Sequence, residues 1–414
     1  MDCFVACGGR DLSRWGIRLQ LCRLGRVSAL PLFCPMWMMD RPTGIGRKVA
    51  MGLSDQMPAL AAAVSRLPGF ATVETADLDP LPTTGLAHDH IRIVGTGVLL
   101  RVPRQSQLAL AARENLIYQA ACFRRMAASG HTPKLYGIIE PTPEIPMGSL
   151  VVEEISGETL TLPAGLADAA RALAAIHALP LPPVAERSPL KDPEDAVAAT
   201  LEEMLVQGRH LSSPHAPVSK SGREAIEAEI DTVREEIRHL PSVTKTLISF
   251  DAHPGNFILE QGSGRAVLVD LEKGRYGGAG FDLAHATLYT STTWDVATYS
   301  EPSVAQIADF YATWLATVPK ELGSALKPWL LPMRRIMWLW SVTWCAKWAV
   351  ESRATRVADK HAAASAEDWS AENTGGTLID HVANRVECYL SDAIIARVRS
   401  DWRGDNALTG LLSE

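Results

Sequence analysis

Residues 247–272 read LISFDAHPGNFILEQGSGRAVLVDLE, and they predict three short strands separated by a loop and a tight turn. Asp251 lies in the loop after the first apolar run, and Asn256 follows five residues later. Asp270 ends the last apolar run, after a turn that contains Gly262. Because that turn folds the third strand back on the second, we expect Asp270 to lie beside Asn256.

These three side chains have the chemistry that phosphoryl transfer from a magnesium nucleotide requires. A carboxylate must orient the acceptor hydroxyl and take its proton, and two oxygen ligands must hold the metal against the phosphates. A single Asp or Asn in a loop is more often a turn former or a cap. The combination is more specific than any one residue. It makes Asp251 the candidate catalytic residue, and Asn256 and Asp270 the candidate metal ligands.

Three segments extend the pattern: SFDAHPGN at residues 249–256, VDLE at 269–272 and FDLA at 281–284. Through them the chain resembles the aminoglycoside phosphotransferase and choline kinase-like family, a branch of the protein-kinase-like fold. In that family the segments typically read HGDLHPGN, I-D-W/F-E and YDLA. In order and spacing, the resemblance covers roughly residues 70–350.

The resemblance has two departures in the loop. Ser249 stands where the family has His, and Phe250 stands where it has Gly. That His usually braces the loop without touching the phosphoryl group, so the chemical positions are retained. The resemblance also implies that Asp282 supports the catalytic loop through hydrogen bonds and that His253 is structural.

The implied architecture is an α+β, two-lobed protein-kinase-like fold. A small lobe of antiparallel strands and one main helix would span residues 52–155 and bind the nucleotide. A larger, mainly helical lobe would span residues 156–414 and hold the catalytic residues and the acceptor. Residues 1–51 show weak periodicity, four Cys and several Arg, so we expect a disordered extension, with a short membrane-associating segment as the alternative.

Further residues of the nucleotide site follow from the resemblance. Arg101, on a predicted strand, would contact the phosphates, and Glu114, on the next helix, would brace it. Main-chain groups at the hinge between the lobes, Glu153 to Ile155, would hydrogen-bond the adenine edge. Residues 82–87 match the position of the loop that covers the nucleotide. Without the neighbouring motif, Arg101 and Glu114 would read as ordinary exposed side chains.

The resemblance therefore implies an ATP- or GTP-dependent, magnesium-requiring phosphotransferase that moves the γ-phosphate to a hydroxyl of a small molecule. The acceptor would be an aminoglycoside or, alternatively, choline, thiamine or a sugar. A reading from another class is a catalytically weak, nucleotide-binding regulatory protein, which the change at Ser249 and Phe250 motivates. Retention of Asp251, Asn256 and Asp270 argues against that reading.

Composition limits the partners and the compartment. The 414 residues carry a net charge of −7, so no basic field would recruit nucleic acid. No run of 18 uncharged apolar residues predicts a membrane span. The seven Cys form no paired motif, which favours a reducing cytoplasm. The sequence does not indicate an oligomeric state.

Tryptophans recur near the C-terminal end. Trp340, Trp344 and Trp348 are four residues apart and would share one helix face. They are either core residues or part of an acceptor site lined by aromatic rings, which would suit a planar or cationic substrate.

Overall fold

The computed structural model describes residues 52–82, 87–358 and 376–413, with main-chain information only for residues 353–358 and 376–379. The expectations for residues 1–51, and for residues 83–86 of the loop thought to cover the nucleotide, lie outside the described residues. No helix in the described part of the chain is both long enough and apolar enough to cross a membrane.

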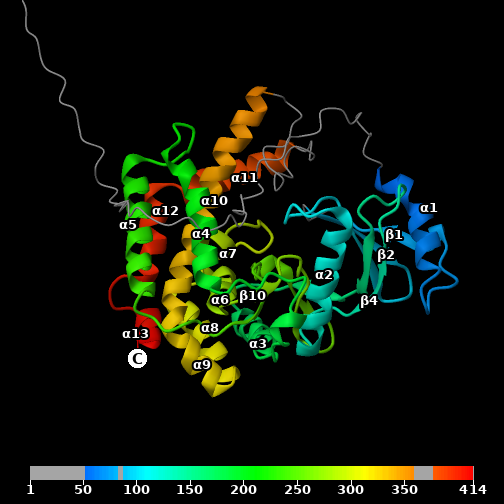
Figure 1. Cartoon of the computed structure of the whole chain (residues 1–414), viewed down its shortest axis with the longest axis horizontal. Coiled ribbons are helices and arrows are strands. Elements are labelled where there is room, and N and C mark those ends of the chain that lie inside the picture. The colour runs from blue at the N-terminus through cyan, green and yellow to red at the C-terminus, as the bar shows by residue number, and fades with distance from the viewer. Residues whose placement is uncertain (1–51, 83–86, 359–375, 414) are drawn as a thin grey trace, which may run out of the picture. The chain divides into compact units, whose positions relative to one another are not determined.

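The small lobe is a five-stranded antiparallel sheet between two helices (Figure 1). Helix α1 (Leu53–Val64) packs against one face, and helix α2 (Ala112–Met126) contacts the other. In sheet order, the strands are β1 (Leu78–Pro80), β2 (His88–Ile93), β3 (Val98–Pro103), β5 (Ser149–Glu153) and β4 (Leu135–Ile139).

Strand β3 shows why Arg101 faces away from α1. Successive side chains of a strand point to opposite faces. Leu100 and Val102 belong to the apolar cluster around α1, whereas Leu99 packs against the cluster that contains α2. Arg101 shares the face of Leu99, so its guanidinium leaves the strand on the α2 side.

The larger part of the chain is mainly helical, which confirms the α+β prediction. Helices α3 and α8 contribute to one apolar cluster, and α4, α5 and the long helix α10 to another (Figure 1). The helices are α3 (Leu166–His177), α4 (Ala196–Gly208), α5 (Lys220–Ile237), α6 (Gly280–Thr287), α7 (Tyr289–Thr292), α8 (Val304–Thr317), α9 (Lys320–Leu326), α10 (Leu330–Ala358), α11 (Gly376–Tyr389), α12 (Asp392–Arg399) and α13 (Ala407–Ser413).

Two small antiparallel sheets organise the segment quoted at the start. One contains β7 (Thr246–Ile248) and β10 (Arg275–Gly277). The other has the order β6 (Gly157–Thr159), β8 (Phe257–Glu260) and β9 (Ala266–Leu268). The loop after β7 ends in a single 3₁₀ turn, Pro254–Asn256, which leads directly into β8.

The β8–β9 hairpin brings the two candidate metal ligands together, as predicted. Its turn uses Gly262 and Gly264 at φ of +89° and +66°, a conformation that glycine adopts without steric cost. Beyond the strands, the N–H of Val269 donates to the carbonyl of Asn256 at 2.9 Å. Asp270 is the next residue, so it lies beside Asn256.

Candidate active site

The loop that carries Asp251 is held by Asp282, in the first turn of α6. Its two carboxylate oxygens accept the N–H groups of Ser249 at 2.8 Å and Phe250 at 2.7 Å. Asp282 is fully buried. A carboxylate that accepts two main-chain N–H groups fixes the direction in which the chain enters the loop. The expected supporting role of Asp282 is thus confirmed.

Asp282 is itself oriented by a buried His. The Nε1–H of Trp314 donates to Nδ1 of His177 at 3.0 Å. Because the indole nitrogen can only donate, Nδ1 must accept, and the ring proton of a neutral His177 lies on Nε2. Nε2 is 3.1 Å from Asp282 and donates to it. Trp314 and Asp282 lie far from His177 in the chain, so no local sequence pattern connects the three residues.

The residue before Asp251, Phe250, is one of the two departures from the family pattern, and its surroundings show how the loop accommodates it. Phe250 has φ of +57°, in the left-handed region that favours Gly. Its ring is buried and makes edge contacts with Phe281 and Trp340, with centroids 5.9 and 5.8 Å apart. The guanidinium of Arg275 lies 3.8 Å from the ring centroid. Packing therefore compensates for a strained main chain at a position where the family has Gly.

The strained main chain at Phe250 predicts which of two substitutions destabilises the protein less. Phe250→Gly and Phe250→Ala both remove the ring, and we expect losses of about 2–5 kcal/mol in the free energy of unfolding. Ala retains the steric penalty of positive φ, so Phe250→Gly should be more stable than Phe250→Ala by about 1 kcal/mol. Urea unfolding of both variants measures the difference. An Ala variant at least as stable as the Gly variant would contradict the assigned strain.

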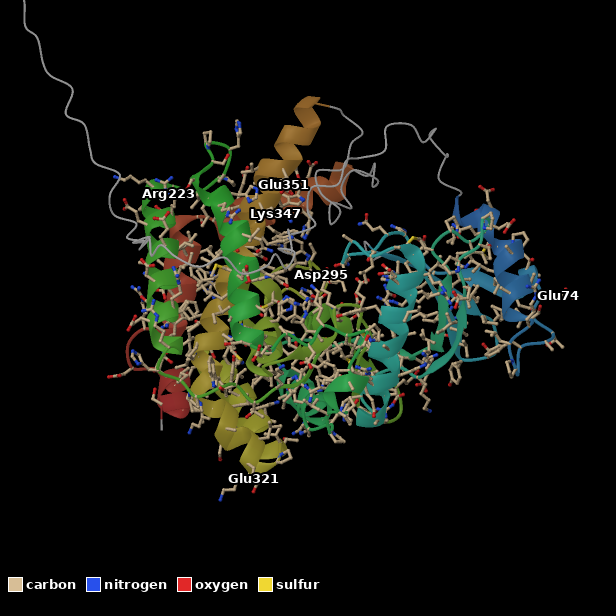
Figure 2. All side chains as sticks on the ribbon, in the orientation of Figure 1. Glu74, Arg223, Asp295, Glu321, Lys347 and Glu351 are labelled. Atoms are coloured by element: carbon tan, nitrogen blue, oxygen red, sulfur yellow. The ribbon has the colours of Figure 1, made fainter. Side chains whose placement is uncertain are left out.

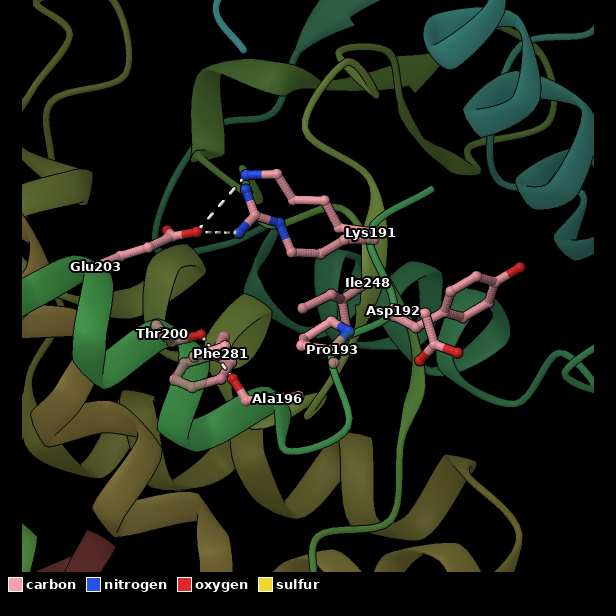
Figure 3. A pocket seen from close by; sticks show the side chains of 12 residues that line it. Lys191, Asp192, Pro193, Ala196, Thr200, Glu203, Ile248 and Phe281 are labelled. Atoms are coloured by element: carbon pink, nitrogen blue, oxygen red, sulfur yellow. Dashed lines mark hydrogen bonds and ion pairs between the residues drawn. The ribbon is translucent and has the colours of Figure 1, made fainter. Parts of the chain in front are cut away.

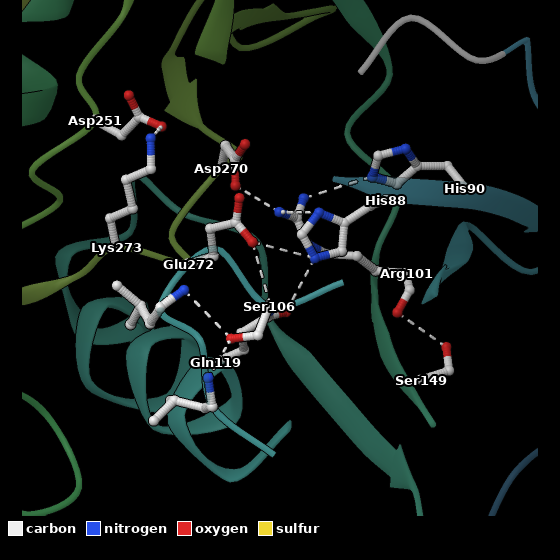
Figure 4. Close-up of polar contacts among 12 residues, drawn as sticks. His88, His90, Arg101, Ser106, Gln119, Ser149, Asp251, Asp270, Glu272 and Lys273 are labelled. Carbon is white, nitrogen blue, oxygen red and sulfur yellow. Dashed lines mark hydrogen bonds and ion pairs between the residues drawn. The ribbon is translucent and has the colours of Figure 1, made fainter. Parts of the chain in front are cut away.

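Asp251 projects from this loop toward a cation that the sequence analysis did not single out. Its Oδ2 is 3.0 Å from Nζ of Lys273 (Figure 4), and its Oδ1 is 3.7 Å from Nδ1 of His285. Burial opposes the charge of Lys273, but the carboxylates of Asp251 and Glu272 outweigh it and raise the pKa of Lys273. The position of Lys273, three residues after Asp270, was the available signal.

The candidate metal ligand Asn256 is held in a defined orientation. Its Nδ2 donates to the main-chain carbonyl of Asp251 at 3.0 Å. The amide oxygen accepts no hydrogen bond from any residue that the structure describes. The side chain is therefore anchored through its nitrogen and presents its oxygen, the atom that a hard cation prefers.

Asp270 meets Arg101 across the two lobes, as Figure 4 shows. The Nη2 of Arg101 is 2.5 Å from Oδ1 of Asp270 and 3.1 Å from Nδ1 of His88. Burial disfavours the charge of Asp270, but Arg101, His88 and Lys273 outweigh it and lower the pKa of Asp270 to about 2. Two predicted site residues far apart in the sequence are thus brought into contact, and Asp270 stays ionised at neutral pH.

The expected pairing of Arg101 with Glu114 is not formed, which corrects the prediction. Glu114 is exposed in the first turn of α2 and has no contact with Arg101 among the described residues. The buried face of α2 instead presents Gln119, which hydrogen-bonds Nε2 of His88 at 3.2 Å and Glu272 at 3.3 Å (Figure 4). Helix phase is the physical reason, because residues five apart lie on different sides of a helix.

Glu272 and His88 form the buried base of this cluster. Oε2 of Glu272 is 3.4 Å from Nε2 of His88, and both residues are 3% exposed. Burial and the nearby charge of Asp270 raise the pKa of Glu272 to about 8. Burial and the charge of Arg101 lower the pKa of His88. The ion pair of Arg101 and Asp270 lies directly above this base.

The two residues predicted to bind adenine at the hinge, Glu153 and Ile155, differ in their hydrogen bonds. The side chain of Glu153 accepts the N–H of Lys134 at 3.1 Å, and its own N–H donates to the Lys134 carbonyl at 2.9 Å. The N–H and carbonyl of Ile155 make no hydrogen bond to any residue that the structure describes. Of these two, Ile155 retains free main-chain groups at the expected position.

The tryptophans of α10 divide between core and surface. Trp348 is buried, whereas Trp340 and Trp344 are only half-buried. Trp340 touches Phe250, next to Asp251, and Trp344 makes an edge contact with Trp294 at 6.0 Å. The core interpretation holds for Trp348, and an acceptor site at Trp340 and Trp344 stays a prediction.

A sequence model of one known family, described as the phosphotransferase enzyme family, matches residues 85–320. No curated protein sequence matches the chain. Among solved structures, a choline/ethanolamine kinase family protein from Mesorhizobium loti is similar, with a TM-score of 0.51 and 16% identity over 86% of this chain and 98% of that one. A choline kinase from Cryptosporidium parvum Iowa II has a TM-score of 0.50 and 14% identity, over 86% and 99% of the two chains. Their likeness shows the protein-kinase-like fold.

Proposed function

This chain belongs to the phosphotransferase enzyme family, and we propose that it moves the γ-phosphate of ATP, bound with magnesium, to a hydroxyl of a small organic molecule. The enzyme class, a small-molecule phosphotransferase with an alcohol group as acceptor, follows from the family. The residues that carry the reaction are our proposal. One observation supports it most: Asp251, Asn256 and Asp270 adjoin one another in a single loop and hairpin, and Asp270 contacts Arg101.

Asp251 would orient the acceptor hydroxyl and accept its proton as the oxygen attacks the phosphoryl group. Its carboxylate is half-buried at the end of a loop whose main chain Asp282 holds. The ammonium group of Lys273, 3.0 Å away, would keep the carboxylate in place and stabilise negative charge on the transferred group.

The donor set fits magnesium bound mainly through a nucleotide. No group of three or more His, Cys, Asp or Glu side chains in the described part of the chain is arranged to hold a metal ion. Asn256 offers a free amide oxygen, and Asp270 offers an ionised carboxylate. Magnesium usually takes one or two protein oxygens together with phosphates and water. When bound, it would neutralise phosphate charge.

Arg101 would contact the phosphates once its present partner is engaged elsewhere. Its guanidinium is 4% exposed and is bonded to Asp270 and His88. A nucleotide that carries a cation offers new partners to both members of this ion pair. The cation binds Asp270, and the phosphate oxygens accept hydrogen bonds from Arg101. The free main-chain groups of Ile155 would receive the adenine edge.

The acceptor side of the site is aromatic. Trp294, Trp340 and Trp344 are half-buried, and Trp340 touches the residue next to Asp251. Figure 2 shows Lys347 and Glu351 one turn apart on α10, so charges of both signs lie on the helix that carries these rings. This composition favours an acceptor with a planar or apolar part. The scattered cysteines of the sequence favour a cytoplasmic site of action.

Nucleotide turnover tests the proposal. The protein is incubated with ATP and magnesium and with aminoglycosides, choline, thiamine and sugars in turn, and phosphorylated products are identified by mass spectrometry. We expect at least one hydroxylated compound to gain a phosphoryl group. A protein that binds ATP but phosphorylates none of the compounds and hydrolyses no ATP would instead be the regulatory protein considered above.

Replacing Lys273 tests its proposed role. We expect Lys273→Met to lower turnover roughly 10- to 100-fold, the loss that one charge-assisted hydrogen bond represents. Nucleotide affinity should change little, because the ammonium group contacts Asp251 rather than the residues assigned to the phosphates. Steady-state kinetics with a nucleotide titration separates the two effects, and unchanged turnover would remove Lys273 from the mechanism.

A further inference from the structure

A cavity of about 340 Å³ lies between α4 and the β7–β10 sheet (Figure 3). Ala196, Thr200 and Glu203 line one wall, because their spacing puts them on one face of α4. Pro193 and Ala199, which are half-buried, supply apolar surface. None of the residues assigned above to the base, the metal or the phosphates lines this cavity, so it is separate from the nucleotide site.

Arg275 lines the cavity with most of its hydrogen-bonding capacity unused. The residue is 8% exposed. Its Nε donates to the carbonyl of Lys273 at 3.3 Å, and its Nη1 is 3.6 Å from Oε1 of Glu203, beyond hydrogen-bonding distance. Its terminal N–H groups make no hydrogen bond to any residue that the structure describes. These groups are therefore available as donors to a ligand that enters the cavity.

Charged side chains of both signs line the cavity. The Nζ of Lys191 is also 3.6 Å from Oε1 of Glu203, so two cations share one carboxylate without a direct hydrogen bond in either pair. The other acidic residue, Asp192, is already engaged by Arg187 at 3.0 Å and Lys245 at 2.7 Å. Two cationic side chains, Lys191 and Arg275, and the carboxylate of Glu203 therefore meet at the cavity.

We propose that this cavity is a second binding site, which takes a small organic molecule bearing a carboxylate. The carboxylate accepts from the free terminal N–H groups of Arg275, which are spaced for two parallel hydrogen bonds, and lies close to Lys191. The apolar part of the ligand packs on Pro193 and Ala199. The volume lies at the small end of the range of ligand cavities, about 300–1,000 Å³.

The site is coupled to the catalytic loop through one contact. The guanidinium of Arg275 lies 3.8 Å from the centroid of the Phe250 ring, and Phe250 directly precedes Asp251. A ligand that accepts hydrogen bonds from Arg275 therefore acts on a side chain that packs on the Phe250 ring. That packing compensates for the strained main chain at Phe250. The natural ligand is thus either an acceptor that carries a carboxylate or a separate effector of turnover.

Binding of three matched probes tests the site without any phosphoryl transfer, so the test stands apart from the proposed reaction. Benzoate, benzamide and benzyl alcohol share one ring and differ in the group offered to Arg275. We expect calorimetric titration of the full chain to detect benzoate and to find benzamide and benzyl alcohol at least tenfold weaker. Equal binding of the three probes would overturn the proposal.

Two variants and a control localise the binding. Glu203→Gln removes the competing carboxylate and should tighten benzoate binding roughly twofold to fivefold, a gain that misfolding cannot produce. Arg275→Met retains an apolar side chain over Phe250 and should weaken benzoate binding roughly tenfold or more. Arg171→Met, which removes an exposed arginine of α3, should leave it unchanged. Unaltered affinity in Glu203→Gln would overturn the assignment to this cavity.

A fourth probe shows whether the natural ligand is an acceptor or a separate effector. With ATP and magnesium present, 4-(hydroxymethyl)benzoate is phosphorylated on its alcohol if the site holds part of the acceptor. If the site serves an effector, the probe changes ATP turnover in the parent but not in Arg275→Met, and no phosphorylated probe forms. A bound probe that does neither would overturn the coupling through Phe250.

Discussion

Asp251→Asn should lower phosphoryl transfer roughly 10²- to 10⁴-fold, the contribution of a positioned general base. The amide has nearly the same shape but cannot accept the acceptor's proton as a carboxylate does. The loop should keep its form, because its hydrogen bonds to Asp282 and Asn256 use main-chain atoms of residues 249–251 rather than the Asp251 carboxylate.

The same variant supplies its own control. Nucleotide affinity should stay within about twofold of the parent, since Arg101 and Asp270 are untouched. Steady-state turnover measured together with nucleotide titration checks both expectations. Turnover within twofold of the parent would show that Asp251 is not the base, and a joint loss of turnover and nucleotide binding would indicate that the loop had collapsed.

The local part of this site could be predicted from the sequence. Asn256 and Asp270 belong to one hairpin, and the Gly residues of its turn determine which residues become neighbours. The structure places Val269 opposite Asn256, as that argument requires. Hairpin geometry is set by a few consecutive residues, so one sequence is sufficient to infer it.

The long-range part depended on the family resemblance, and its one predicted contact, between Arg101 and Glu114, is not formed. Arg101 and Asp270 are 169 residues apart, and no local pattern connects them. Glu114 was chosen by order along the chain, but helix phase makes Gln119 the residue of α2 that reaches the cluster. Lys273 was missed because its partner Asp251 is brought to it only when β7 pairs with β10.

The tryptophan stripe of α10 shows a further limit of sequence periodicity. A spacing of four puts Trp340, Trp344 and Trp348 on one helix face, but it does not say where along the helix the covering elements end. In the structure Trp348 is covered, while Trp340 and Trp344 meet Phe250 and Trp294 and remain half-exposed. The elements that cover α10, among them α4 and α6, are far from it in the sequence.

Asp270→Ala should weaken nucleotide binding when magnesium is present and strengthen it when magnesium is absent. With magnesium, binding should weaken at least tenfold, roughly the value of one charge-assisted contact, because a hard oxygen ligand is lost. Without magnesium, binding should become tighter than in the parent. Arg101 is bonded to Asp270 at 2.5 Å in the parent, and a metal-free nucleotide has to displace that carboxylate while also facing its negative charge.

Nucleotide titrations of parent and variant, each with magnesium and with a chelator, measure both effects. A loss of stability is expected as well, about 3 kcal/mol, because a largely buried arginine loses its carboxylate. Asp401→Ala is the matched control. It removes the partner of Arg334, another buried arginine, at 2.6 Å, and it should cost stability without altering the magnesium dependence. If Asp270→Ala kept the parent's full magnesium enhancement, Asp270 would be a structural partner of Arg101 and not a metal ligand.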